Sequence, residues 1–270
     1  MEIDAAPHVF EDTVGRTLVA PEEGWRSRGD MHPQGTAPFR ASIVGRARFV
    51  EDFLAEAEAT GVTQYVILGA GIDTFVQRHP ASKLRVFEID QPAPQAWKKA
   101  RLAELGLPAP TFVPVDFERD PSWFEALRRA GFDPSRAAVV AQTGVSMYLT
   151  NDANAATLRQ MKALAPGSTF LSTFMLPLDL LPPEERPGME FAMRGARASG
   201  TPFISFYSPE QMQALARDQG LASTRVVLAS EMIAKYFAGR RDGLVPASAE
   251  PMLVVTIQRA TPNATSGNSS

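Results

Sequence analysis

Strand-like and helix-like stretches alternate along the chain from about residue 39 onward. Short apolar runs predict seven strands, at 64–70, 84–90, 111–116, 137–143, 168–175, 224–230 and 251–258. Amphipathic or polar stretches between them predict helices, at 40–59, 95–105, 121–130, 151–164 and 209–219. Such alternation predicts an α/β fold with a Rossmann-like, doubly wound, mostly parallel seven-stranded sheet. Because Pro114 interrupts the third strand, we expect that strand near an edge of the sheet.

Three segments depart from this alternation. Residues 1–38 contain many glycines and prolines, a pattern equally consistent with an N-terminal arm or lid and with a partly disordered tail. The main domain is predicted to span 39–260, with an insertion at 177–207 after the fifth strand, and the small polar residues 261–270 predict a disordered tail. Parallel sheets bind ligands at the carboxyl ends of their strands, so the insertion is placed to cover a substrate as a second lid.

Composition narrows the functional classes. The chain has 270 residues with 27 basic against 30 acidic side chains, which leaves no electrostatic footprint for nucleic acid. The absence of cysteine excludes disulfides, Cys-ligated zinc and thiol catalysis within this chain, and no metal site is predicted. No apolar run approaches the roughly 20 residues of a membrane span. Because the acidic N-terminus also lacks a secretory signal, we expect a cytoplasmic protein; a homodimer stays open.

A glycine loop follows the first predicted strand. Gly69, Ala70 and Gly71 allow a tight turn and a close backbone approach to a ligand, with a helix-like segment after them. A carboxylate is then expected about 20 residues further on to accept from ribose hydroxyls. Glu88 and Asp90 both lie near that spacing, and Asp90, at the strand end, is the better placed. The alternative for Asp90 is an ordinary turn residue.

The loop departs from a dinucleotide fingerprint. That fingerprint requires a third glycine for close helix–strand packing, and this chain has Thr74 there, preceded by Asp73. An acidic Asp73 also disfavours a pyrophosphate. A cofactor with ribose and adenine but without phosphates fits better, and S-adenosylmethionine, whose sulfonium is positively charged, tolerates nearby carboxylates.

Four ordered blocks carry a family resemblance. They read VILGAGIDT, VFEIDQPAPQAWKKARL, FVPVDFERD and TGVSMYLT, and similarity extends from about Arg40 to Gln258. The chain resembles the leucine carboxyl methyltransferase-like class I S-adenosylmethionine-dependent methyltransferases, including bacterial members associated with polyketide and other secondary metabolism. The resemblance implies a class I methyltransferase fold with S-adenosyl-L-methionine as cofactor.

The resemblance also implies roles for particular residues around the adenosine end. The glycine loop, including Ala70, would contact the methionine portion of the cofactor, and Asp90 would accept from the ribose hydroxyls. Asp116 would accept from the exocyclic amine of adenine, and Phe117, where the family usually has leucine, would cover the ring.

Arginine and threonine positions complete the implied cofactor site. Arg46 matches the helix arginine that pairs with the cofactor carboxylate, although Arg40 and Arg48 are nearby rivals and each could belong to a solvated helix face. Thr143 stands where many relatives carry an acidic residue or an apolar side chain. It is expected to border the cofactor next to Gly144, but without a charge.

The acceptor site is less defined by the sequence. Met147, Tyr148, Phe206 and Tyr207 are candidates for substrate contact, with core packing as the alternative for the first two. We assign no catalytic base; His32, in the arm, is the candidate considered. The predicted function is O-methylation of a carboxylate or hydroxyl on a small, partly apolar metabolite, driven by proximity and orientation. The alternatives are C- or N-methylation in a natural-product pathway, or a degenerate cofactor-binding protein without turnover.

Overall fold

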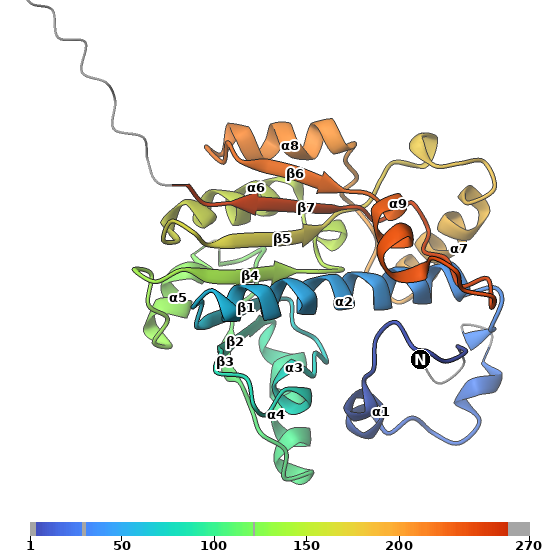
Figure 1. Ribbon diagram of the computed structural model, residues 1–270, viewed down its shortest axis with the longest axis horizontal. Coiled ribbons are helices and arrows are strands. Elements are labelled where there is room, and N and C mark those ends of the chain that lie inside the picture. Colours follow the sequence, from blue (N-terminus) through green and yellow to red (C-terminus); the bar gives the residue numbers. More distant parts are fainter. Residues whose placement is uncertain (1–3, 29–30, 121, 259–270) are drawn as a thin grey trace, which may run out of the picture.

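A seven-stranded sheet runs through the centre of the protein (Figure 1). This computed structural model describes residues 4–28, 31–120 and 122–258. The strands are β1 (Gln64–Leu68), β2 (Arg85–Asp90), β3 (Thr111–Pro114), β4 (Ala138–Gln142), β5 (Thr169–Thr173), β6 (Thr224–Val227) and β7 (Met252–Thr256). The α-helices are α1 (Thr13–Val19), α2 (Ala37–Ala59), α3 (Phe75–Arg78), α4 (Pro92–Glu104), α5 (Trp123–Arg129), α6 (Asn151–Gln160), α7 (Arg186–Ala198), α8 (Pro209–Asp218) and α9 (Ala229–Met232). Shorter turns are η1 (Trp25–Ser27), η3 (Ser146–Tyr148), η4 (Met161–Ala163), η5 (Leu178–Leu180) and the π-helical η6 (Ile233–Phe237).

The strand order confirms the predicted fold class. The order is β3-β2-β1-β4-β5-β7-β6, and the pairs among β1 to β5 are all parallel. All seven predicted strands are present, each slightly shorter than its apolar run, and β3 lies at an edge as the proline in it suggested. β7 runs antiparallel between β5 and β6, a direction that its apolar sequence does not encode.

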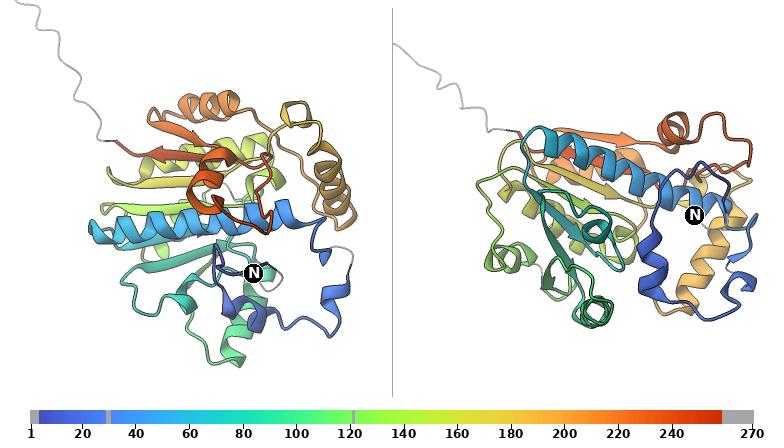
Figure 2. Two further views of the ribbon diagram at one scale, coloured as in Figure 1. Left: turned by 45° about the vertical axis from the view of Figure 1, so that its right-hand side comes forward. Right: turned by 60° about the horizontal axis from the view of Figure 1, so that its bottom comes forward.

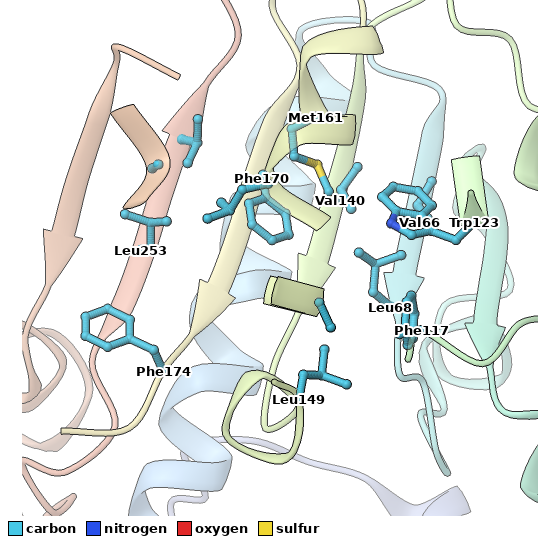
Figure 3. Packing of buried hydrophobic residues seen from close by; sticks show 14 of the residues in the cluster. Val66, Leu68, Phe117, Trp123, Val140, Leu149, Met161, Phe170, Phe174 and Leu253 are labelled. Carbon is cyan, nitrogen blue, oxygen red and sulfur yellow. The ribbon is translucent and has the colours of Figure 1, made fainter. Parts of the chain in front are cut away.

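Helices cover both faces of the sheet, which explains why the central strands are apolar throughout. On one face, side chains from α5, α6 and α8 pack on alternate strand residues such as Val66, Leu68 and Val140 (Figure 3). On the other face, α2, α3 and α9 pack on the intervening residues, among them Tyr65 and Ile67. Each of β1, β4 and β5 is buried at every position. The sheet is therefore a rigid support for the loops at its carboxyl edge.

The N-terminal arm and the insertion both lie beyond that edge (Figures 1 and 2). Residues 4–28 of the arm contain α1, whose N-terminus is capped by Asp12, and η1. Arg240 donates hydrogen bonds to the carbonyls of Ala5 and Pro7, at 2.8 and 2.6 Å. The sequence pattern missed α1, and also α7, which forms the body of the insertion.

Two further predictions concern the C-terminal tail and membrane spans. The tail 261–270 lies outside the described residues. Within the described part of the chain, no helix combines the length and the apolar character needed to cross a membrane.

Candidate functional site

The loop between β1 and α3 supplies two glycines with positive φ. Gly69 has φ +69° and Gly71 has φ +49°, a backbone region that side chains disfavour. A Cβ atom on Gly69 would lie 2.5 Å from Cγ2 of Val145, so the loop after β4 packs directly on it. A Cβ atom on Gly71 would meet no atom within 4 Å. Gly69 is therefore closed in by protein, and Gly71 presents its backbone to open space.

Asp90, the last residue of β2, is joined to this loop. Its Oδ2 accepts a hydrogen bond from the backbone N–H of Gly71 at 2.5 Å, and its Oδ1 accepts one from that of Gln91 at 2.7 Å. Asp90 is half-buried at the mouth of the loop. Each carboxylate oxygen keeps a further lone pair for a hydroxyl group.

Glu88, the alternative carboxylate on β2, is placed elsewhere. It is buried against α4, where Lys98 Nζ lies 2.6 Å from its Oε2 and both side chains are 1% exposed. Burial raises the pKa of Glu88 to about 7, and the neighbouring Lys98 charge opposes that rise. Because Glu88 is buried and paired with Lys98, the structure favours Asp90 as the carboxylate that a ligand at the loop would meet.

Asp116 and Phe117 follow β3 at the same edge. The backbone N–H of Val115 donates to the carbonyl of Asp90 at 2.8 Å, which keeps the two strand ends adjacent. The Asp116 carboxylate is half-exposed and accepts from the N–H of Glu118 at 3.0 Å. Phe117 is 8% exposed and belongs to the core cluster that also contains Leu68 (Figure 3). The Asp116 carboxylate thus faces the edge, while most of the Phe117 ring is committed to packing.

Of the three candidate arginines, Arg46 lies against the loop after β4. A Cβ atom on Gly144 would be 2.6 Å from Nη2 of Arg46, so guanidinium and backbone are in close contact. Arg40 instead pairs with Asp4 of the arm at 2.7 Å. Arg48 pairs with Asp52 one turn along α2, also at 2.7 Å.

Glu250, which the sequence patterns did not single out, holds Arg46. Its Oε1 accepts from Nη1 of Arg46 and, at 2.7 Å, from the hydroxyl of Thr173. The Thr173 hydroxyl in turn accepts from the N–H of Gly144 at 2.7 Å. Because β7 is antiparallel to β5, the segment before β7, which contains Glu250, lies at the carboxyl edge of β5. A charged residue directly before the last apolar run was the available signal, but only the strand direction gives it meaning.

Arg46, Gly144 and Glu250 form the floor of a cavity of about 180 Å³. The cavity opens between α2, η3, α7 and the segment that precedes β7. Its lining residues are Phe39, Ser42, Ile43, Arg46, Gly144, Met147, Tyr148, Met175, Met189, Ala192, Phe203, Ala247, Ala249 and Glu250. Apart from Arg46 and Glu250, no residue in this lining carries a charge at neutral pH.

The acceptor candidates separate into two groups. Met147 is buried in the cavity wall, and Tyr148 is 41% exposed there, edge-on to Phe203 with ring centroids 5.3 Å apart. Burial raises the pKa of Tyr148, which therefore keeps its phenolic proton at neutral pH. Tyr207 is instead a core residue that donates to Oδ1 of Asn151 at 2.7 Å.

The remaining predicted positions do not line this cavity. Phe206 is half-buried and packs against the core cluster. His32 is exposed, and its Nδ1 accepts from the N–H of Gly35 at 3.1 Å. Thr143 is half-buried beside Gly144, near the cavity floor.

S-Adenosylmethionine fits the groups gathered at this edge. Gly71 has an open backbone, Asp90 and Asp116 are carboxylates near the strand ends, and Arg46 on α2 is a cation, so the edge offers the kinds of group that suit this cofactor. With the strand order above, this arrangement defines a class I S-adenosylmethionine-dependent methyltransferase.

Comparison with known proteins gives the family. The leucine carboxyl methyltransferase family profile matches residues 1–162, and the chain belongs to that family. YktD of Bacillus subtilis, provisionally named an S-adenosyl-L-methionine-dependent methyltransferase, is 31% identical over 207 residues, covering 74% of this chain and 67% of YktD. A Mycobacterium tuberculosis protein with the same provisional name is 32% identical over 290 residues, covering 96% and 88% of the two chains.

A solved structure shares the fold. The crystal structure of a protein from Thermobifida fusca YX, provisionally described as a methyltransferase, superposes with a TM-score of 0.62 at 18% identity. The match covers 94% of this chain and 97% of that one. The class, the family and the cofactor predicted from the sequence are therefore confirmed.

Proposed function

We propose that the protein transfers the methyl group of S-adenosylmethionine to an oxygen, of a hydroxyl or a carboxylate, on a small and partly apolar molecule. The single observation that carries this proposal is the cavity of about 180 Å³, in which a polar floor meets apolar walls. The floor is formed by Arg46, Gly144 and Glu250, beside the glycine loop. The walls come mainly from aromatic, methionine and aliphatic side chains of α2, η3 and α7.

The cofactor would be held by groups already described. Gly71 would contact its methionine portion, Asp90 the ribose hydroxyls, Asp116 the adenine amine and Arg46 the carboxylate. When bound, the cofactor supplies an activated methyl group on a positively charged sulfur. The protein's task is then to orient the acceptor and exclude water, and orientation alone can contribute about 7–11 kcal/mol.

The residues of the cavity favour an acceptor that needs little proton transfer. A carboxylate is ionised near neutral pH and needs no base. The described residues that line the cavity include no histidine, and Tyr148, with its raised pKa, is a hydrogen-bond donor rather than a base at neutral pH. Tyr148 would therefore orient an acceptor oxygen, while Met147 and Phe203 contact its apolar body.

We infer that the arm acts as a lid over the other end of the cofactor. Residues 4–28 lie beyond the carboxyl edge of the sheet, and Asp12 accepts from the hydroxyl of Thr74, at the end of the glycine loop, at 2.8 Å. Arg101 of α4 donates to the carbonyl of Leu18 at 3.1 Å. Arm residues also line a wide hollow of about 740 Å³. The insertion 177–207 would cover the acceptor end through α7.

The proposal is tested by methyl transfer from isotope-labelled S-adenosylmethionine to a panel of apolar carboxylic acids, phenols and amines, with the product atom mapped by mass spectrometry. We expect label on oxygen. Label on nitrogen or carbon would refute O-methylation, and tight cofactor binding with no product would favour a protein without turnover.

A matched pair of variants locates the acceptor. Ala192 of α7 lines the cavity, so A192F should raise the KM for the acceptor at least tenfold and leave affinity for S-adenosylhomocysteine unchanged. Ala198, exposed at the end of the same helix, provides the control A198F. Equal behaviour of the two variants would exclude this cavity as the acceptor site.

A further inference from the structure

A continuous chain of hydrogen bonds crosses the floor of the cavity. It runs from the guanidinium of Arg46 to the carboxylate of Glu250, then to the hydroxyl of Thr173 and the N–H of Gly144. Arg46 is 21% exposed and Glu250 is 10% exposed, so both charges are largely withdrawn from water but reach the cavity. Thr173 is 1% exposed, and the hydrogen bond from its hydroxyl helps to fix the position of the Glu250 side chain.

The two oxygens of Glu250 are used unequally. Both hydrogen bonds, from Arg46 and from Thr173, end on Oε1. Among the residues that the structure describes, none donates a hydrogen bond to Oε2. A carboxylate held through one oxygen, with the other available at a cavity wall, is a preorganised acceptor for a cationic donor.

The guanidinium of Arg46 also has capacity left. It has five N–H donors, and the bond to Glu250 engages Nη1, while Nη2 lies against the backbone of Gly144. The floor therefore places the guanidinium of Arg46, which has unused N–H donors, next to the carboxylate of Glu250, which has an unused acceptor oxygen. Such a pair is complementary to an amino-acid zwitterion, which carries a carboxylate and an ammonium on one carbon.

In the described parts of the chain, Glu250 is also the one carboxylate that lines this cavity and could receive an ammonium. Among the residues lining the cavity it is the single acidic side chain. Thr143, the position expected from the sequence to border the cofactor, has no charge. Asp90 lies at the glycine loop and is engaged with Gly71.

We propose that Glu250 binds the α-ammonium group of the cofactor's methionine portion through Oε2, while Arg46 binds the α-carboxylate. The inference rests on the proposed placement of that end of the cofactor at Arg46. Glu250 would thus recognise the cofactor from the segment before β7. It also positions Arg46, so one side chain serves both charges of the ligand.

A different role for Glu250 predicts the opposite change in cofactor affinity when its carboxylate is removed. If Glu250 only occupied Arg46 and had to give way to the ligand carboxylate, its removal would free Arg46 and strengthen binding. If it contacts the ammonium, its removal leaves a charged donor without its partner, which weakens binding by about ten- to one-hundredfold.

Calorimetric titration with three ligands separates the charges. S-Adenosylhomocysteine has both groups, its decarboxylated analogue keeps the amine alone, and 5′-methylthioadenosine has neither. For E250Q we expect about ten- to one-hundredfold weaker binding of the first two ligands and less than twofold change for the third. For R46Q we expect weaker binding of S-adenosylhomocysteine only.

Two further variants serve as controls for the titrations. E125Q removes a carboxylate from an exposed ion pair with Arg128 on α5 and should leave all three affinities unchanged. The double variant T143E/E250Q places a carboxylate one residue before Gly144 and should recover part of the lost affinity.

The outcomes are distinct. Unchanged or tighter binding of S-adenosylhomocysteine by E250Q overturns the proposal, as does an equal loss for 5′-methylthioadenosine, which would indicate a general structural defect. Failure of the wild-type protein to bind S-adenosylhomocysteine would instead contradict the cofactor site as a whole. Normal binding by the wild-type protein combined with a lack of O-methylation would leave the role of Glu250 intact.

Discussion

Gly69 and Gly71 lie two residues apart in one loop, yet the structure predicts different consequences when each is replaced by alanine. Both have positive φ, and placing an alanine in that region costs roughly 1–2 kcal/mol. At Gly69 the new Cβ would also lie 2.5 Å from Cγ2 of Val145, and overpacking of this kind typically costs about 1–3 kcal/mol. G69A should therefore lose about 2–5 kcal/mol in the free energy of unfolding, whereas G71A should lose about 1–2 kcal/mol.

Urea unfolding and ligand titration distinguish the two variants. G71A adds a methyl group where the structure has open space, and the cofactor is proposed to fill that space. We therefore expect a loss of affinity for S-adenosylhomocysteine that exceeds its small loss of stability. In G69A, a second change of Val145 to alanine should recover most of the overpacking cost, because it removes the methyl groups that clash. Equal stability of G69A and G71A, or no recovery in the double variant, would refute the packing argument.

Three further predictions follow from single contacts. D90A removes the carboxylate that is bonded to Gly71 and is proposed to bind the ribose, so it should lower affinity for S-adenosylhomocysteine at least tenfold in calorimetry; unchanged affinity would exclude the ribose role. Burial raises the pKa of Glu88 from an ordinary 4.5 to about 7 in the folded protein, so between these values the folded state holds the proton more strongly than the unfolded state. The contribution of Glu88 to stability is therefore greatest below pH 4.5 and is lost as pH rises through about 7. E88Q should consequently compare better with wild type at pH 8 than at pH 5 in urea unfolding, and the opposite trend would contradict the pKa shift. D12A removes the α1 cap and the bond to Thr74, so limited proteolysis should cleave the arm faster; an unchanged cleavage rate would show that other contacts hold it.

Much of the fold was predictable because the central strands are apolar at every position. A run such as 64–68 is buried on both faces, and this pattern distinguishes it from the amphipathic helices around it. Strand direction was not predictable, since the apolar run of β7 reads the same in either orientation. The helix α7 was missed because the proline and glycine at its start are typical of a loop. Some of its apolar side chains line the cavity.

The location of the proposed cofactor site was predictable to the extent that it follows the ends of consecutive strands. Asp90 ends β2, and Gly71 and Asp116 follow within three residues of the ends of β1 and β3, where parallel strands bring such residues to one edge. The contact between Arg46 and Glu250 joins residues 204 positions apart, and no local pattern contains it. The family resemblance had already favoured Arg46 over Arg40 and Arg48, and the tertiary fold adds that Arg40 pairs with Asp4 and Arg48 with Asp52.

The account's central claim is that the carboxyl edge of the sheet binds S-adenosylmethionine. Thermal unfolding with and without S-adenosylhomocysteine, with NAD as the comparison ligand, tests it most directly. At a concentration about one hundred times its dissociation constant, S-adenosylhomocysteine should add about 2.7 kcal/mol, or about 5 °C in the midpoint, and NAD should add nothing. A midpoint raised by NAD alone, or by neither ligand, would contradict the claim.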